Sequence, residues 1–435
     1  MNQRALALST LVLLATSCGD AGKAVAPESD GLITLRQAKY SARVELGTLG
    51  GTSSFANDIN DAGVVVGSAQ TSSGQTHAYR WTVNGGMVDL GALPGHDYSA
   101  AIDVDDAGIV LGVSGVSWFG SCCQEGTQTD VVWDAVGTIS TLNRPFAVPA
   151  GFFSIRLTTL PNAAGQWAAT VVGPPNPGTG SDETAFFFSP ASGLINLRAL
   201  GIASGVDPSV LSALTYSLLT AMNERGTVLQ TGGGEDQWRP VLWNATTGFV
   251  STGIPPGANP ADTRVLSRGM NNLDEIVGWY QSVGLGPSFD IVDGPYRWAA
   301  STGFVPLPDP YGDGVASAIN DNGEAVGFVL PFEVVAAAWP RKGGLRLLET
   351  SPGHNSFALA INAEGLAIGW EATGGRSGET HALLWNTHRV HIVPGSKAKG
   401  PRSKSAFATA VSRCLTRPGT KTQRVRCLAS PLESQ

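Results

Sequence analysis

Charged residues are scarce in this sequence: they make up only 14% of its 435 residues. Glycine and proline are frequent, with 55 and 26 residues, and they fall between short apolar runs. Disordered chains show the opposite pattern, with few apolar residues and a high net charge. The composition is therefore typical of a turn-rich β protein, and the length suffices for one large repeat domain.

The sequence also lacks the short motifs that identify common enzyme classes. It has no Gly-x-Ser-x-Gly elbow, no His-Glu-x-x-His, no Gly-Lys-Ser/Thr phosphate loop and no Ser-x-Asp-x-Gly-x-x-Trp box. The acidic stretches 103–106 and 309–314 lack the ligand spacing and final glutamate of an EF-type calcium loop. Paired carboxylates for glycoside cleavage stay open, because their separation in space is invisible in a sequence. We predict no catalytic residue, no cofactor and no metal site.

Long apolar runs are absent except at the N-terminus. Residues 5–15 are apolar and follow Arg4, so this segment reads as an export signal, too short to span a bilayer as a stable helix. We expect residues 1–17 to be a signal peptide and residues 18–42 a flexible tether that leads into the domain.

The end of this signal resembles a bacterial lipobox. It reads Leu14-Ala15-Thr16-Ser17-Cys18, with Ala15 where the lipobox usually has Leu. The resemblance implies cleavage before Cys18 and attachment of lipid to that residue. An ordinary secreted protein is the alternative.

One stretch, Ile59-Asn60-Asp61-Ala62-Gly63-Val64-Val65-Val66-Gly67, returns six more times in degenerate form. Each copy has an apolar residue, Asn or Asp, two polar or small residues, usually Gly, and then a β-branched run. Asn at the first corner of a type I turn braces the backbone, and Gly takes the left-handed position that closes a hairpin. The first corners are Asn60, Asp105, Asn162, Asn223, Asn271, Asn320 and Asn362, spaced 45, 57, 61, 48, 49 and 42 residues apart.

Two further positions recur along the units, one in five of them and one in all seven. A strand glycine follows the corner residue by seven positions in five copies, which indicates a close backbone approach or a bulge. An aromatic anchor ends a later strand, and we expect it to lie in the core. The glycines are Gly67, Gly112, Gly278, Gly327 and Gly369, and the anchors are Trp81, Trp133, Phe188, Trp243, Trp298, Trp339 and Trp385.

Three aromatic residues follow directly on these strand glycines, namely Trp279, Phe328 and Trp370. They are interpreted as packing between blades rather than as a surface for stacking a ligand.

Four short strands per unit and this repeat length predict a β-propeller, in which each blade buries its faces against its neighbours. Seven units favour seven four-stranded antiparallel blades over residues 43–395. The N-terminal segment from Val44 to Gly51 matches the fourth-strand segments, so it is a candidate to complete the last blade and remove an exposed edge. The segment from His388 to Val393 competes for the same place, and the sequence does not decide between them.

The first unit also resembles the HAF family of extracellular repeats. That family is bacterial, is expected to be exported and has no established biochemistry. The resemblance implies an exported, all-β repeat protein, and the sixth and seventh units share it in part. The matching segments are Leu46-Gly47-Thr48-Leu49-Gly50-Gly51, Ile59-Asn60-x-x-Gly63, Val66-Gly67, His77-Ala78-Tyr79-x-Trp81 and Gly86-Met87-Val88-Asp89-Leu90-Gly91.

Long insertions are predicted to share one face of the ring. Strands in a blade alternate in direction, so the second-to-third connections and those between blades emerge on the face opposite the Asn corners. Long loops on one face of a rigid scaffold commonly carry recognition. The insertions are 114–128, 174–183 and 282–293, plus 198–216 before the fourth unit.

One insertion carries the only ligand-binding residues that we predict. Trp118 and Phe119 could stack on a sugar or peptide, and the adjacent Cys122 and Cys123 could form a vicinal disulfide. The alternative is a loop folded onto its own aromatic side chains.

The C-terminal segment 396–435 breaks the repeat pattern and is expected to be a flexible, basic tail. Residues 397–435 hold nine Lys and Arg against one acid, whereas the whole chain carries a net charge of −7. Cys414 and Cys427 could close a small disulfide loop in an oxidising compartment. The tail is either an anion-binding or polymer-binding segment or a solvated extension without a partner.

These observations favour a non-catalytic binding or scaffolding propeller that is anchored in the cell envelope. Its expected partner is an envelope protein or polysaccharide, and a lipid on Cys18 would hold it to the outer membrane or cell surface. We expect a monomer that binds no nucleic acid. The alternative is a secreted propeller enzyme, a polysaccharide lyase or glycosidase with its site in the central funnel, and a third reading is a structural spacer.

Overall fold

Strands make up most of the residues that the computed structural model describes, which are 43–116, 128–176, 180–214, 218–233, 238–283, 291–330, 333–373 and 379–388. In these ranges the strands form five four-stranded sheets and one eight-stranded sheet. The eight-stranded sheet consists of two groups of four, which a single parallel pairing of Thr76 with Tyr98 joins. The described strands thus fall into seven groups of four, called blades below. The predicted all-β propeller of antiparallel four-stranded blades is confirmed.

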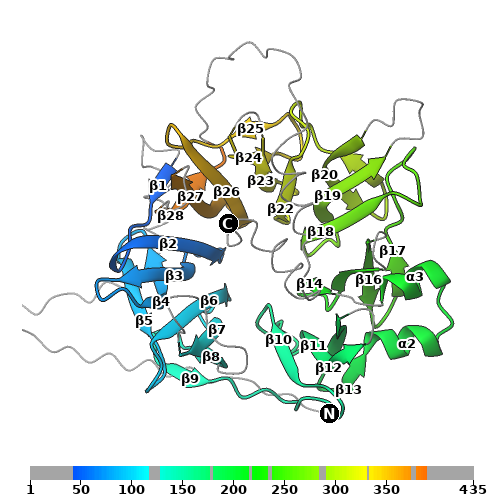
Figure 1. The fold of residues 1–435 in the computed structure, drawn as a ribbon, viewed down its shortest axis with the longest axis horizontal. Coiled ribbons are helices and arrows are strands. Elements are labelled where there is room, and N and C mark those ends of the chain that lie inside the picture. Colours follow the sequence, from blue (N-terminus) through cyan, green and yellow to red (C-terminus); the bar gives the residue numbers. More distant parts are fainter. Residues whose placement is uncertain are drawn as a thin grey trace, which may run out of the picture. The chain divides into compact units, whose positions relative to one another are not determined.

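The blades follow one another in chain order (Figure 1). Blades 1 to 4 contain β2 (Gly50–Ile59), β3 (Val65–Thr71), β4 (Thr76–Thr82) and β5 (Gly86–Gly91); β6 (Tyr98–Val104), β7 (Val110–Gly115), β8 (Thr129–Trp133) and β9 (Ile139–Thr141); β10 (Ser154–Leu157), β11 (Trp167–Asn176), β12 (Gly180–Ser189) and β13 (Gly193–Asn196); and β14 (Leu218–Met222), β15 (Val228–Gly232), β16 (Arg239–Asn244) and β17 (Gly248–Ser251). Blades 5 to 7 contain β18 (Arg264–Met270), β19 (Ile276–Val283), β20 (Ile291–Ala299) and β21 (Gly303–Pro306); β22 (Val315–Ile319), β23 (Ala325–Val329), β24 (Val335–Trp339) and β25 (Arg346–Leu347); and β26 (His354–Ile361), β27 (Leu366–Thr373), β28 (Thr380–Asn386) and β1 (Arg43–Glu45).

The N-terminal strand β1 completes the last blade. It pairs antiparallel with β28, and Arg43 lies opposite Trp385. Sequence analysis proposed two segments for this outermost strand, the N-terminal segment from Val44 to Gly51 and the segment from His388 to Val393. Of the competing segment, residues 389–393 lie outside the described residues.

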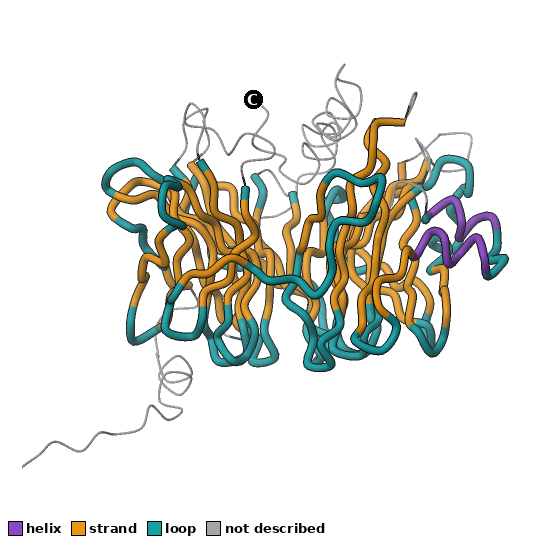
Figure 2. The backbone as a smooth tube through the Cα atoms, turned by 90° about the horizontal axis from the view of Figure 1, so that it is seen from below, coloured by secondary structure: helices purple, strands orange, loops and turns teal. Residues whose placement is uncertain are grey.

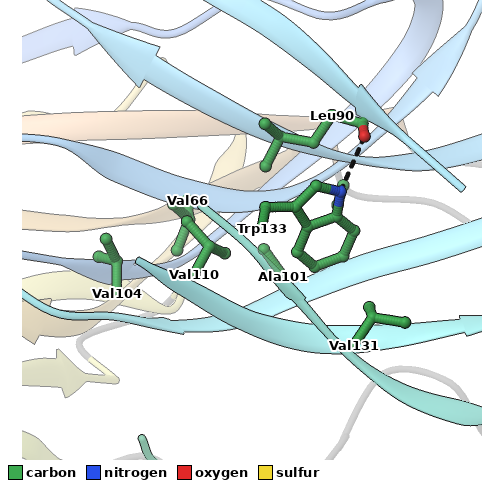
Figure 3. Close-up of a cluster of buried hydrophobic side chains, with 8 residues drawn as sticks. Val66, Leu90, Ala101, Val104, Val110, Val131 and Trp133 are labelled. Atoms are coloured by element: carbon green, nitrogen blue, oxygen red, sulfur yellow. Dashed lines mark hydrogen bonds between the residues drawn. The ribbon is translucent and has the colours of Figure 1, made fainter. Parts of the chain in front are cut away.

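The anchor tryptophans lie between neighbouring blades. Trp133 of blade 2 is fully buried, and its indole N–H donates to the carbonyl oxygen of Leu90 in blade 1 at 2.8 Å (Figure 3). Trp339 and Trp385 make the same kind of bond, to Pro308 O and Glu349 O of the preceding connection. Truncating a buried aromatic side chain of this size typically costs about 3–5 kcal/mol. The predicted core role of these anchors is confirmed.

Each corner is a tight turn that its own Asn or Asp side chain braces. In the first corner, Gly63 N–H donates to Asn60 O at 3.0 Å and Asn60 N–H donates to Val64 O at 3.1 Å. The Asn60 Oδ1 atom accepts a further bond from Val64 N–H at 2.9 Å. Gly63 has a φ of +78°, the left-handed conformation that glycine adopts without strain. Asp274 takes the same conformation in the fifth corner, at a φ of +60°.

The other end of the asparagine amide joins each corner to the next blade. The side-chain Nδ2 donates to the backbone carbonyl of the corresponding corner residue one blade further on, and Asn362 of blade 7 donates to Asn60 of blade 1, which closes the ring. The bonds are Asn60 to Asp105 O (2.8 Å), Asn162 to Asn223 O (3.3 Å), Asn223 to Asn271 O (3.0 Å), Asn271 to Asn320 O (3.0 Å), Asn320 to Asn362 O (2.9 Å) and Asn362 to Asn60 O (3.0 Å).

Blade 2 is the exception because its corner residue is Asp105. A carboxylate has no N–H to donate, so it accepts from Ile109 N–H within its own turn at 2.7 Å but cannot form the bond to blade 3. In its place, Asp103 Oδ2 accepts the backbone N–H of Leu160 in blade 3 at 2.6 Å.

The strand glycines stand where the first strand bulges toward the second. A Cβ atom built on Gly369 would lie 1.8 Å from Phe357 O, and one on Gly67 would lie 2.0 Å from Phe55 O. The strand register shifts at the same place, after Ala358 in blade 7. Both parts of the sequence interpretation, close approach and bulge, are confirmed.

Two short helices correct the prediction for residues 198–216, which sequence analysis treated as an inserted loop. They are α2 (Leu197–Ala203) and α3 (Pro208–Ala213). Asn196 caps α2 by accepting from Ala199 N–H at 2.9 Å, and Asp207 caps α3 by accepting from Ser209 N–H at 2.8 Å. In the described part of the chain, no helix has the length and apolarity needed to span a membrane.

The interblade bond can be tested by replacing Asn320 with Asp. Asn320→Asp keeps the oxygen that braces its own turn and loses the donor to Asn362, so we expect the free energy of unfolding to fall by about 1 kcal/mol or more. Denaturant melting measures the change. Asn322→Asp is the matched control, because the Asn322 donor lies on the surface and bonds Ala363 O at 2.7 Å. An equal loss in both variants would contradict the assignment.

The strand glycines can be tested by adding one methyl group. Gly369→Ala places a Cβ against a backbone carbonyl, and we expect a loss of about 1–3 kcal/mol in unfolding free energy. Gly344→Ala is the control, since nothing lies within 4 Å of a Cβ at that position. A stable Gly369→Ala variant with an unchanged melting curve would exclude the close-approach argument.

Candidate functional site

The two ends of the strands form two different faces. The corner face carries the seven corners, six with Asn and one with Asp, and the turns between third and fourth strands, seen as the short turns along the lower edge of Figure 2. The insertion face lies at the opposite strand ends. Three predicted insertions join a second strand to a third, and the fourth joins blade 3 to blade 4, so strand order places all four on the insertion face. The predicted loop 174–183 is corrected to a lengthened hairpin, because β11 runs to Asn176 and β12 begins at Gly180.

The residues predicted as ligand-binding, lipidated or disulfide-bonded lie outside the described residues. These are Trp118, Phe119, Cys18, Cys122, Cys123, Cys414 and Cys427. The strand ends that flank the Trp-Phe pair, Gly115 of β7 and Thr129 of β8, are described and stand at the insertion face. The roles of these residues stay predictions.

The aromatic residues that follow the strand glycines pack between blades, as predicted. Trp370 stacks on Phe357 with ring centroids 4.4 Å apart and meets Phe55 of blade 1 edge-on at 5.5 Å. Phe328 of blade 6 meets Phe357 edge-on at 5.1 Å, and Trp279 packs against the same cluster. The rings therefore serve the contacts of neighbouring blades.

Two aspartates from neighbouring first strands lie side by side. Asp58 Oδ2 accepts Val104 N–H at 2.9 Å, and the Asp58 and Asp103 carboxyl groups hydrogen-bond to each other. Burial, with the negative charge of Asp103, raises the pKa of Asp58 well above its usual range, and burial also raises the pKa of Asp103. Two carboxyl groups in direct contact share a proton, and they are too close to leave room for a glycoside between them.

Ionisable side chains near the insertion face contact ionisable partners in three places within the described part of the first three blades. The pairs are His77 with Asp89 at 2.9 Å, Asp130 with Arg144 at 3.8 Å, and Arg156 with Glu183 at 2.9 Å.

Blade 5 differs, because three aspartates gather there. Asp293 at the start of β20 hydrogen-bonds Asp313, and Asp309 lies close enough to act on its charge. Burial and the charge of Asp313 raise the pKa of Asp293 to about 7. Asp309 accepts Tyr311 N–H at 3.0 Å and Gly314 N–H at 2.8 Å, so part of its charge is satisfied by the backbone.

The sequence signalled only part of this group. Asp309 and Asp313 belong to the acidic stretch 309–314, whose spacing does not match an EF-type calcium loop. Asp293 lies in β20, separated from that stretch by β21, and no sequence motif around it predicts the contact. Within the described ranges, no set of three or more His, Cys, Asp and Glu side chains is arranged to hold a metal ion.

Comparisons with known proteins bear on the fold alone. No protein-family model and no curated protein match the chain. Among solved structures, the chain is similar to the β-propeller domain of the trilobed protease from Pyrococcus furiosus, with a TM-score of 0.47, 9% identity, and coverage of 77% of this chain and 96% of that one.

Two other solved structures are similar at the same level. One is an acylaminoacyl peptidase from Pyrococcus horikoshii, with a TM-score of 0.45, 10% identity and coverage of 79% of this chain. The match spans 53% of that peptidase, about half its length. The other is an oligogalacturonate lyase in complex with manganese, with a TM-score of 0.47, 10% identity, and coverage of 79% of this chain and 92% of that one.

The aspartate group of blade 5 predicts a pH-dependent stability. An aspartate ordinarily titrates near 4, so a folded-state pKa of about 7 for Asp293 means that its stabilising protonated form is lost as the pH rises through 7. Asp293→Asn removes the ionising group. We expect a higher melting temperature than the parent at pH ~8 and little difference at pH ~4, where Asp293 is protonated.

Asp134→Asn is the control for this experiment. Backbone hydrogen bonds, first of all from Thr138, lower the pKa of Asp134, so its charged form is the stabilising one. The control should not raise the melting temperature at the higher pH. A gain for Asp293→Asn that is the same at both pH values would contradict the ionisation of Asp293 as its cause.

Proposed function

We propose that this chain is a non-catalytic binding module of the bacterial cell envelope, and that it binds a protein or polysaccharide through its insertion face. The observation that carries the proposal is the difference between the two faces. On the corner face the first-to-second turns are short, and six interblade amide bonds fix them in place. The length variation falls on the opposite face, which is how recognition loops are displayed on a rigid scaffold.

The anchoring part of the proposal is supported by the position of the first described residue. Arg43 lies opposite Trp385 at the corner-face end of β28. We expect residues 18–42 to be a tether that is lipidated at Cys18, as the export expected from the HAF resemblance allows. This tether would therefore join the domain on the corner face.

A lyase or glycosidase with its site in the central funnel is less well supported. The carboxyl pair that lies on the inner strands, Asp58 and Asp103, uses two of its oxygens to accept backbone N–H groups from blades 2 and 3. Those bonds fix neighbouring blades to each other. They favour a structural use of the pair over one in proton transfer to a substrate.

The binding proposal can be tested by screening the full chain against glycan arrays and envelope extracts. For a ligand found in this way, the double substitution Trp118→Ala with Phe119→Ala should weaken binding about thirtyfold, the effect of losing about 2 kcal/mol at an aromatic contact. Leu273→Ala is the control, since Leu273 is 55% exposed on the corner face. Weaker binding by the control alone, or conversion of the polysaccharide to shorter products, would overturn the proposal.

A further inference from the structure

Acidic side chains collect on the corner face. The seven corners, counted from the Asn or Asp to the closing residue, contain a single base, Arg225, which pairs with Asp274 at 3.2 Å. Acids remain in excess, ten against six bases, when the charged residues of the neighbouring turns and strand ends are added, which are Arg80, Arg297, Arg341, Lys342, Arg346, Asp134, Glu275 and Glu324. The corner acids are Asp61, Asp105, Asp106, Glu224, Asp274, Asp321 and Glu364.

One carboxylate beside this surface has an oxygen without a partner. Glu324, the residue after the sixth corner, is only 5% exposed, and its Oε1 atom has no hydrogen-bond donor within the described part of the chain. Its Oε2 atom lies 3.7 Å from Nε2 of His388, the last described residue. A buried carboxylate oxygen without a donor is costly, so this position favours an additional cation.

The preceding blade shows how the same position is satisfied. Glu275 is the residue after the fifth corner, and its Oε2 atom accepts from the Arg341 guanidinium of blade 6 at 2.6 Å. Arg341 lies over the sixth corner just as His388 lies over the seventh: a Cβ on Gly323 would meet Arg341 Nε at 2.3 Å, and one on Gly365 would meet His388 Nε2 at the same distance. A guanidinium thus completes the first site, and the imidazole stands too far away to complete the second.

The chain itself supplies cations next to this place. His388 follows β28 at its corner-face end, and residues 397–435 hold nine Lys and Arg against one acid, Glu433. The first of these cations, Lys397, comes nine residues after His388, and nine extended residues span roughly 30 Å. This length is enough for Lys397 to reach the corners of blades 6, 7 and 1. These corners are direct neighbours, because Asn320 bonds the corner of blade 7 and Asn362 bonds that of blade 1.

We propose that the basic segment 397–435 binds the acidic corner face of its own chain, and that one of its Lys or Arg side chains completes the Glu324 carboxylate. Two observations favour this segment as the binding partner: its positive charge complements the acidic corner face, and it follows His388, which lies at the corner-face end of β28. This contact is separate from ligand binding on the insertion face, so either proposal can fail without the other.

Trypsin cleavage of the purified full chain tests the contact, because trypsin cuts after the same Lys and Arg residues that would be bound. At about 20 mM NaCl we expect cleavage in segment 397–435 to be at least about tenfold slower than at about 500 mM, where surface charges are screened. The triple variant Asp61→Asn, Asp106→Asn, Asp321→Asn should lose the low-salt protection. Each Asn keeps an oxygen for the neighbouring backbone N–H that the Asp accepts from.

Two further variants keep the result interpretable. Asp262→Asn, Glu333→Gln and Glu379→Gln together remove the same amount of charge from exposed positions at the insertion-face ends of the strands, and this control should keep full protection. Glu324→Gln alone should speed low-salt cleavage severalfold, with its fold checked by thermal melting. Rapid cleavage of the parent at low salt, or equal release by the corner and control variants, would overturn the proposal.

Discussion

The asparagine at each corner uses both ends of its amide, and the arrangement of the blades depends on this double use. Its oxygen accepts N–H groups of its own turn, and its nitrogen donates to the matching turn of the next blade. Buried polar groups are costly unless all their partners are present. A blade that shifted along its neighbour would leave a buried donor and a buried carbonyl unpaired at once, so these bonds fix the relative height of the blades.

This constraint also separates the two faces of the ring. A corner that must place its asparagine against the next carbonyl has little freedom in length. Toward the opposite strand ends, the hydroxyls of Ser54, Ser99 and Ser356 accept backbone N–H groups of the preceding blade, but these serines lie within strands, so the loops beyond them can hold insertions. The interface between blades 2 and 3 lacks the corner bond, because Asp105 has no N–H to donate. There Asp103 and the packing of Leu111 against Ile155 and Leu157 supply the contact.

Signals that depend on a few consecutive residues were readable in the sequence. The turn at Asn60, the bulge beside Gly369 and the burial of Trp133 all follow from local rules of turn geometry, backbone access and aromatic burial. The helices α2 and α3 were missed although Asn196, Asp207 and Pro208 are good capping residues, because two helices of seven and six residues leave too short a periodic pattern. The donor role of the corner asparagines was missed too, since its acceptors lie 42 to 61 residues away, or across the ring closure.

The sequence by itself determined the repeat, its strands and turns, the apolar anchors and the charge of the C-terminal segment, because each of these depends on neighbouring residues. Only the tertiary structure decided that β1 pairs with β28, that Asp58 meets Asp103 and Asp293 meets Asp313, and that Glu324 keeps an oxygen without a donor among the described residues. These contacts join residues that are distant along the chain, and their existence depends on the order and register in which whole blades pack.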